Sequence, residues 1–366
     1  MIRPSGHHGT TTKTAYIFLI AVLIMASVLT AFLAACSNTK RIEMRVLCAG
    51  SLMVPFEAIE KAYEAKYPDI DILIEGHGSI QVIRHVTELY EEADVMAVAD
   101  HSLIPMLMYN TTMPDTGKSY ASWYIQFTTN SLGIAYTPDS RYAGEINENN
   151  WYEVLSRPGV KVGISDARLD ACGYRAFMLL QLAETYYGDD TIFEKVLGPF
   201  NPTLNVEQTE AGTRILVPEI LRPTDERIAL RGSSIRLLAL LESGDIDYAF
   251  EYWSVAEQHQ LNFLPLPPEI NLSEVEYAGL YSEVRCELDF HRFASVNPMF
   301  TGTPIIYGIT IPKNAPHYDK AIQFIEFLLS DEGQQILNEN YQLPLIPLEA
   351  NNTDEVPEEI SNLLNG

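Results

Sequence analysis

Two Gly-Ser steps stand where an anion could be held. Gly50-Ser51 follows an apolar segment at 44–48, Gly78-Ser79 follows another at 70–74, and each precedes apolar residues at helical spacing. A helix start offers unpaired backbone N–H groups and the positive end of the helix dipole, which bind anions without Lys or Arg. Each serine can also simply cap its helix. Because the step occurs twice in equivalent strand-helix units, we expect both hydroxyls to converge on one anion site.

The elements that must position these serines alternate between strand and helix. We expect strands at 44–48, 70–74 and 93–98, with helices at 56–67 and 80–90 between them. This order predicts a parallel sheet covered by helices, whose strands end at a common crevice. A second α/β unit is predicted by the following segments: strand 161–164, helix 173–187, helix 235–243 and strand 246–252.

Two apolar segments are long enough to cross between the units, at 122–136 and 304–311. We therefore expect two α/β lobes. Lobe I takes residues 42–125 and, with the return crossing and a last long helix near 318–338, residues 304–350. Lobe II takes residues 126–252, residues 253–303 connect, and the polar tail 351–366 is expected to be loosely held.

The first 36 residues have the form of a lipoprotein signal. An uncharged apolar run from Ala15 to Ala35 ends in Leu33-Ala34-Ala35-Cys36, an aliphatic residue and two small residues before a cysteine that is lipidated after cleavage. An uncleaved membrane anchor is the alternative, since the run is long enough to span a bilayer. Both interpretations place the rest of the chain outside the cytoplasm, tethered by its N-terminus to the outer face of the cell membrane.

The remaining cysteines and the net charge limit the function further. Cys48, Cys172 and Cys286 form no CxxC pair, so no zinc site is indicated; a Cys172–Cys286 disulfide and three buried thiols both stay open. The formal charge is −25, which argues against nucleic acid as a partner. An acidic chain can still bind an anion, because distant surface charge is screened within about 10 Å.

Several spaced motifs together resemble the archaeal-type tungstate/molybdate-binding proteins of ABC importers. The resemblance covers about residues 44–345 and is carried by Ala49-Gly50-Ser51-Leu52-Met53-Val54-Pro55-Phe56, Gly78-Ser79, Ala93-Asp94-Val95, Ala99-Asp100-His101-Ser102-Leu103-Ile104-Pro105, Asp170-Ala171-Cys172-Gly173-Tyr174-Arg175 and Glu242-Ser243-Gly244-Asp245-Ile246-Asp247-Tyr248. It implies a two-lobed, type II periplasmic-binding-protein-like α/β fold, each lobe a mostly parallel sheet flanked by helices. It also implies a set of oxyanion-binding residues: Ser51, Ser79, Asp170, Ala171, Cys172, Ser234 and Tyr252.

Ser234 departs from the family pattern, in which this position is a glutamate. In the family an Asp and this Glu can add to the metal of the oxyanion, so here only Asp170 remains, unless Glu219 or Glu226 reaches the site. Beside a dianion Asp170 must bind that metal, accept a proton from the ligand or point away. A protonated phosphate would suit the second case, and a helix N-cap is the purely structural alternative for Asp170.

The resemblance implies transport rather than catalysis. We expect a monomeric solute-binding protein without a cofactor, which passes tungstate or molybdate to an ABC permease and its ATPase. The alternatives are a phosphate- or sulfate-binding protein and a secreted hydrolase that pairs Asp170 or Asp100 with a histidine. His77 and His101 lie near predicted strand ends, but the sequence contains no recognisable local motif of nucleophile, base and orienting acid.

Overall fold

A computed structural model describes residues 41–366 except 199, 202–203, 290–297 and 365–366. The predicted signal and Cys36 therefore lie outside the described residues. Of the helices described, none combines the length and the apolar composition that crossing a bilayer requires.

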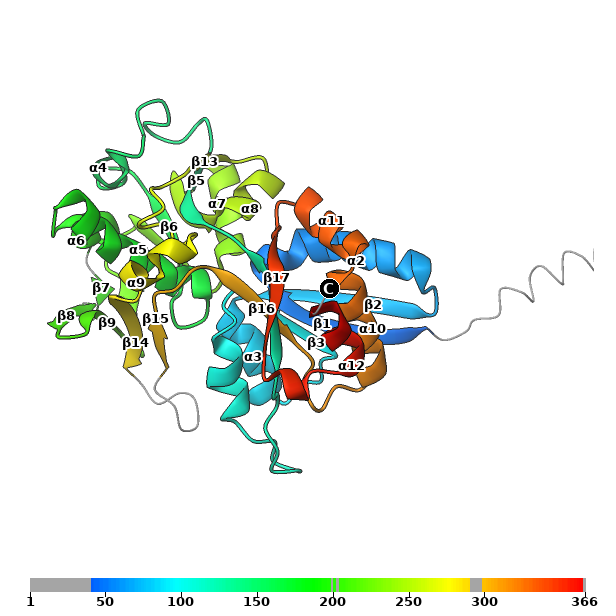
Figure 1. Ribbon diagram of the computed structural model, residues 1–366. Coiled ribbons are helices and arrows are strands. Elements are labelled where there is room, and N and C mark those ends of the chain that lie inside the picture. The colour runs from blue at the N-terminus through cyan, green and yellow to red at the C-terminus, as the bar shows by residue number, and fades with distance from the viewer. Residues whose placement is uncertain (1–40, 199, 202–203, 290–297, 365–366) are drawn as a thin grey trace, which may run out of the picture. The chain divides into compact units, whose positions relative to one another are not determined.

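One six-stranded sheet contains the first three predicted strands. Its order is β17-β4-β16-β3-β1-β2, and its strands other than β4 are labelled in Figure 1. β1 and β3 pair in parallel, whereas β16 is antiparallel to both β3 and β4. The bounds are β1 Ile42–Ala49, β2 Ile70–His77, β3 Val95–Val98, β4 Tyr124–Thr129, β16 Ile306–Thr310 and β17 Leu343–Asn351.

Helices of this first unit follow the predicted apolar spacing. In α2 (Met53–Lys66) the expected face of Phe56, Ile59 and Tyr63 is fully buried. The next helix, α3 (Ser79–Thr87), ends earlier than predicted, because Tyr90 takes a positive φ of 57° and is exposed. The predicted long helix near 318–338 is two helices, α10 (Tyr318–Leu329) and α11 (Asp331–Glu339), because Ser330 is extended and caps α11 through Gly333 N.

A five-stranded sheet forms the second unit, in the order β11-β6-β12-β5-β13. β6 pairs in parallel with β11 and β12, while β5 is antiparallel to β12 and β13. The bounds are β5 Leu132–Tyr136, β6 Val162–Ser165, β11 Ile228–Arg231, β12 Tyr248–Tyr252 and β13 Asn262–Leu264. The chain thus passes from the first sheet to the second between β4 and β5, within the segment predicted to cross.

Helices of the second unit include the long α5 (Ala171–Tyr187), close to its predicted span. The helix expected at 235–243 begins as a 3₁₀ turn, Ser234–Leu237, and continues as α7 (Leu238–Ser243), which ends at left-handed Gly244. The others are α4 Trp151–Leu155, α6 Ile192–Leu197, α8 Trp253–Gln258 and α9 Ala278–Tyr281.

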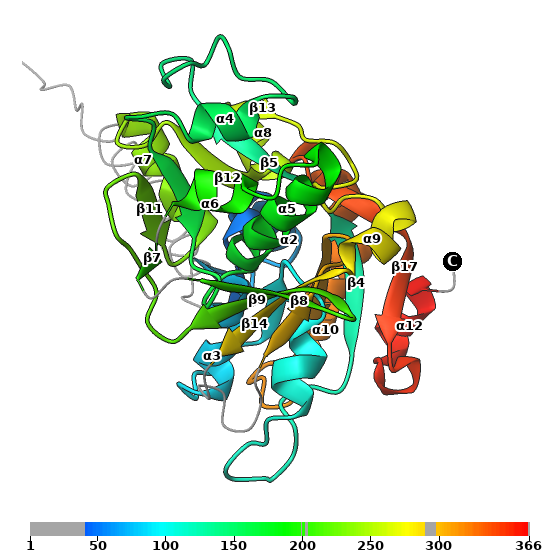
Figure 2. The ribbon, with the colours of Figure 1, turned by 90° about the vertical axis from the view of Figure 1, so that its left-hand side faces the viewer.

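Two further features were not predicted. A four-stranded sheet, in the order β15-β14-β9-β8, brings together β8 (Asn205–Thr209), β9 (Gly212–Pro218), β14 (Val284–Asp289) and β15 (Met299–Thr301). Figure 2 shows β8, β9 and β14 side by side. The tail is not loosely held as expected, because it forms α12 (Glu358–Leu364), in which Ile360 is fully buried. A short pair of strands, β7 (Phe200–Asn201) and β10 (Arg222–Pro223), completes the described sheets.

Of the two alternatives left open for the cysteines, the structure shows three buried thiols and no Cys172–Cys286 disulfide. Cys48, Cys172 and Cys286 are free and buried, so these thiols act as small apolar side chains.

Candidate functional site

Ser51 lies in a 3₁₀ turn, Gly50–Leu52, directly after β1, and its side chain does not cap that turn. Its Oγ lies 2.8 Å from Tyr307 Oη, and the same Tyr307 oxygen accepts a hydrogen bond of 3.2 Å from Asn130 Nδ2. Tyr307 Oη accepts from Asn130, and either hydroxyl can be the donor in its hydrogen bond with Ser51. When Tyr307 donates, the Ser51 hydrogen is available to a further acceptor.

Ser79 is the first residue of α3, and its side chain likewise makes no capping hydrogen bond. The fully buried Oγ instead accepts a hydrogen bond of 3.0 Å from the backbone N–H of Ala99, just after β3. A backbone N–H can only donate, so the hydroxyl hydrogen of Ser79 also remains available to an acceptor. The interpretation of these two serines as helix caps is therefore wrong.

The first-turn amides of α3 are not open to an anion, contrary to expectation. Ile80 N and Gln81 N donate to the Leu169 carbonyl at 3.1 and 3.2 Å, and Ser79 N lies 3.4 Å from Asp170 Oδ1. This approach requires Gly78, since a Cβ there would lie 2.5 Å from Leu169 O. The segment before α5 thus lies directly against the start of α3, and Ser79 offers its hydroxyl rather than its amide.

Asp170 is the N-cap residue of α5, but its side chain makes no capping hydrogen bond. Its Oδ2 accepts a hydrogen bond of 2.9 Å from Ser234 N, while Oδ1 faces the Ser79 amide. Burial raises the pKa of Asp170, and the hydrogen bond from the Ser234 amide opposes this rise. Asp170 thus holds the N-cap position as the structural alternative expected, while its carboxylate joins the start of α3 to the 3₁₀ turn at Ser234.

Ala171 and Cys172 form the buried first turn of α5. Cys172 Sγ donates to Phe250 O at 3.5 Å. Burial raises the pKa of Cys172 well above its ordinary value, so it remains a thiol rather than a thiolate. Any contribution of this turn to anion binding comes from backbone amides at the helix start.

Ser234 forms a hydrogen bond with Glu251, a carboxyl group that was not predicted as part of the site. Its Oγ donates to Glu251 Oε1 at 2.9 Å, and Tyr252 N donates to the same oxygen at 2.8 Å. Glu251 is completely buried, whereas Glu219 and Glu226, named as the alternative carboxylates for the site, are exposed. The sequence did contain a signal for this site residue, because Glu251 is the single acidic residue in an otherwise apolar and aromatic strand.

Tyr252 ends β12 and is held by an arginine that was also missed. Arg175 Nη1 donates to Tyr252 Oη at 3.0 Å and to Ala99 O at 2.6 Å. Since arginine only donates, the Tyr252 hydroxyl hydrogen is free for an acceptor, as in the two serines.

The same arginine is paired with Asp100. Arg175 Nη2 lies 3.4 Å from Asp100 Oδ2, and Tyr174 Oη donates to that oxygen at 2.6 Å. Burial by itself would raise the pKa of Asp100, but the arginine and the surrounding donors hold it below its ordinary value. Asp100 is thus an ion-pair partner in this arrangement.

No hydrogen bond joins Asp100 or Asp170 to a histidine in the described part of the chain. His77 stacks on His85 with ring centroids 4.4 Å apart, and His101 Nδ1 lies 3.2 Å from Tyr124 Oη. The carboxylate-histidine pairing that a hydrolase requires is therefore not assembled among these residues.

A continuous set of contacts connects the two predicted serines. From Ser51 it passes through Tyr307, whose ring centroid is 6.1 Å from that of Tyr252, and then from Tyr252 through its amide to Glu251. From Glu251 it runs through Ser234 and Asp170 to the amide of Ser79. All the predicted oxyanion-binding residues thus lie in or beside one buried polar network: Ser51, Ser79, Asp170, Ala171, Cys172, Ser234 and Tyr252.

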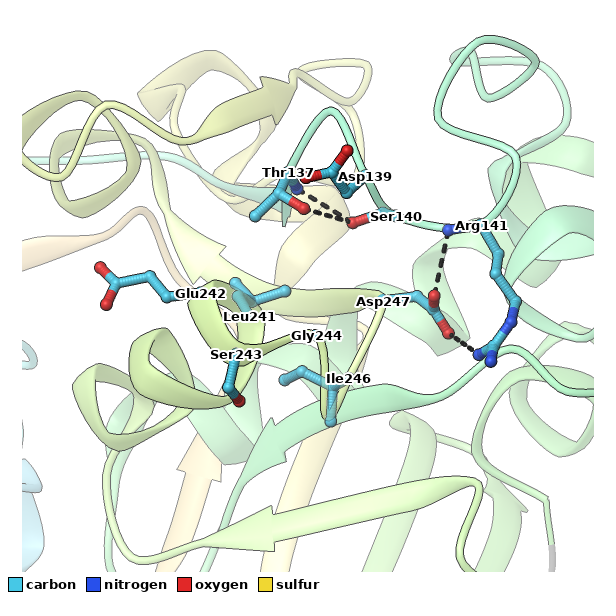
Figure 3. A pocket seen from close by; sticks show the side chains of 10 residues that line it. All are labelled: Thr137, Asp139, Ser140, Arg141, Leu241, Glu242, Ser243, Gly244, Ile246 and Asp247. Carbon is cyan, nitrogen blue, oxygen red and sulfur yellow. Dashed lines mark hydrogen bonds and ion pairs between the residues drawn. The ribbon is translucent and has the colours of Figure 1, made fainter.

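The motif from Glu242 to Tyr248 lies outside this network. Glu242, Ser243 and Gly244 line a separate cavity of about 330 Å³, shown in Figure 3. There Asp247 accepts hydrogen bonds from Arg141 and Lys161 N, so it fastens a loop of the second unit.

Comparison with known proteins now identifies the family. Residues 44–341 match the sequence model of the family described as bacterial extracellular solute-binding protein. The chain belongs to this family. The family consists of extracytoplasmic solute-binding proteins, which are transport components of importers rather than enzymes.

Relatives of this solute-binding protein confirm the resemblance to the tungstate/molybdate group. The molybdate/tungstate-binding protein of Pyrococcus abyssi is 40% identical over 336 residues, which cover 90% of this chain and 91% of that protein. An uncharacterized solute-binding protein of Methanoculleus marisnigri is 39% identical over 325 residues, covering 89% and 87%.

Solved structures confirm the two-lobed type II fold. The periplasmic molybdate-binding protein of Azotobacter vinelandii matches with a TM-score of 0.51 and 14% identity, covering 83% of this chain and 99% of that one. The sulfate-binding protein SubI of Mycobacterium tuberculosis matches with a TM-score of 0.51 and 12% identity, covering 84% and 88%.

Proposed function

We propose that this solute-binding protein captures tungstate or molybdate between its two lobes and delivers it to an ABC permease and its ATPase. Lobe I, residues 42–125 and 304–350, supplies Ser51 and Ser79; lobe II, residues 126–252, supplies the other binding residues. Cys36 carries the lipid anchor that holds the protein, as a monomer, on the outer face of the membrane. Binding requires no cofactor.

The observation that carries this proposal is that three buried hydroxyls can each accept from a protein donor and keep their own hydrogen for another acceptor. Ser79 and Tyr252 each receive a hydrogen bond from a group that can only donate, and Tyr307, which accepts from Asn130, can donate to Ser51. In this arrangement three hydroxyl hydrogens are available to acceptors. An oxyanion such as tungstate or molybdate, with acceptor oxygens only, suits these donors, and neutral donors hold it without a buried ion pair.

Asp170 supports a fully deprotonated ligand over phosphate. A protonated phosphate must donate its hydrogen, and a carboxylate with an open oxygen would receive it. The oxygens of Asp170 face the backbone amides of Ser79 and Ser234, at 3.4 and 2.9 Å. A ligand hydrogen would have to share these oxygens with the two amides, whereas a ligand without hydrogens leaves both contacts unchanged.

Calorimetric titration with tungstate, molybdate, sulfate and phosphate tests the proposal. Tungstate or molybdate is expected to bind tightest. In Ser79→Ala the loss of one hydrogen bond to a charged ligand, about 1.5–3 kcal/mol, weakens binding by roughly 10- to 150-fold. The matched control is Ser243→Ala, since Ser243 is exposed on α7 and lies outside the network. Tightest binding of phosphate, or no binding of any oxyanion, would overturn the assignment.

A further inference from the structure

Glu251 is a carboxyl group in the middle of a buried strand, between Phe250 and Tyr252 of β12. It has no exposed surface. Its two carboxyl oxygens differ in their hydrogen bonds. Oε1 accepts two hydrogen bonds, from Ser234 Oγ at 2.9 Å and from Tyr252 N at 2.8 Å, whereas Oε2 is buried and has no hydrogen-bond partner among the described residues.

A buried carboxyl oxygen without a partner is unusual, because almost all buried polar groups are hydrogen-bonded. The ionisable groups that face Glu251 are acidic or neutral: Asp170 and Cys172 at the start of α5, Tyr252 on its own strand and Tyr307 on β16. Arg175, the arginine that bonds to Tyr252, is also engaged with Ala99 and Asp100 and makes no ion pair with Glu251. A charged Glu251 would therefore be buried beside a second carboxyl group without a cation to compensate it.

The neutral form of Glu251 accounts for these contacts. Burial raises the pKa of Glu251 to about 8. Because Oε1 already accepts two hydrogen bonds, the proton belongs on Oε2. A protonated Oε2 is a hydrogen-bond donor, and it needs an acceptor that the described protein does not supply.

We propose that Glu251 is a further ligand-binding residue, which in its neutral form donates a hydrogen bond from Oε2 to one oxygen of the captured oxyanion. This inference rests on the proposed function, and it adds a fourth side-chain donor to those of Ser51, Ser79 and Tyr252. Such a donor favours anions whose oxygens all accept hydrogen bonds.

Titration of tungstate into Glu251→Gln and Glu251→Met at pH 7 tests the inference. Glutamine keeps the acceptor at Oε1 and provides an N–H donor in place of the O–H, so affinity is expected to stay within about threefold of the wild type. Methionine has a similar length but no donor, and is expected to weaken binding by roughly 10- to 100-fold. Glu242→Gln, on the separate outer cavity, is the control and is expected to bind like the wild type.

Each outcome decides between the alternatives. A Met variant that binds like the wild type means that Glu251 does not contact the ligand. A Gln variant as weak as the Met variant means that an ionised carboxylate is required, which overturns the neutral donor. If thermal unfolding shows that the Met variant does not fold, the Gln variant decides alone, because a loss above tenfold overturns the inference and retention supports it. A wild type that binds no oxyanion refutes the proposed function itself.

Discussion

Tyr252→Phe removes one hydroxyl and leaves the ring in place. The ring is buried at the end of β12, so its packing is preserved. If Tyr252 donates to the oxyanion, the lost charge-assisted hydrogen bond is worth about 1.5–3 kcal/mol, which weakens binding by roughly 10- to 150-fold. Arg175 Nη1 also loses an acceptor but keeps the Ala99 carbonyl at 2.6 Å, so the free energy of unfolding should fall by only about 1 kcal/mol.

The assay is calorimetric titration with tungstate, combined with urea unfolding of the ligand-free protein. Tyr248→Phe is a matched control on the same strand, because the Tyr248 hydroxyl donates to the Arg141 carbonyl beside the outer cavity. It should lower stability slightly and leave tungstate affinity unchanged. A change of less than threefold in the affinity of Tyr252→Phe would refute the role of this hydroxyl, and an equal loss in both variants would point to a general effect on the strand.

Three other perturbations have definite expected outcomes. Asp100→Asn leaves Arg175 buried without its ionic partner, and titration should show tungstate affinity lowered at least tenfold; unchanged affinity would contradict a supporting role for this pair. Gly78→Ala places a Cβ 2.5 Å from Leu169 O and should weaken tungstate binding more than tenfold. The control Gly144→Ala, whose added Cβ has nothing within 4 Å, should bind like the wild type. Equal affinities in the two variants would show that the close approach of Leu169 to Gly78 is not needed. Because the raised pKa of Glu251 is about 8, its neutral form is lost as pH rises, so tungstate affinity should fall roughly fivefold between pH 8 and 9 in the wild type but not in Glu251→Gln. A flat wild-type profile would contradict the neutral donor.

Local patterns predicted the elements that carry the site. The apolar spacing of Phe56, Ile59 and Tyr63 and the position of Asp170 before α5 are both visible within a few residues of sequence. The repeated Gly-Ser step after a strand selected Ser51 and Ser79 from among many serines, and the resemblance then agreed with that choice.

Long-range contacts decide what the local pattern left open. The two serines do not cap their helices, because Tyr307 lies 256 residues from Ser51 and the Ala99 amide lies 20 residues from Ser79. Arg175 and Asp100 are 75 positions apart in the sequence and meet only in the folded chain. β9 and β14 pair across a long intervening segment, so a region interpreted as a connection contributes a sheet.

The central claim is that one oxyanion contacts the hydroxyls of Ser51, Ser79 and Tyr252 together. Crystals of the protein with tungstate, measured at a tungsten absorption edge, locate the metal directly. We predict a single anomalous peak, with oxyanion oxygens about 3 Å from both Ser Oγ atoms and from Tyr252 Oη. A tungsten peak that contacts only one of these hydroxyls, or that lies elsewhere on the protein, would contradict the account.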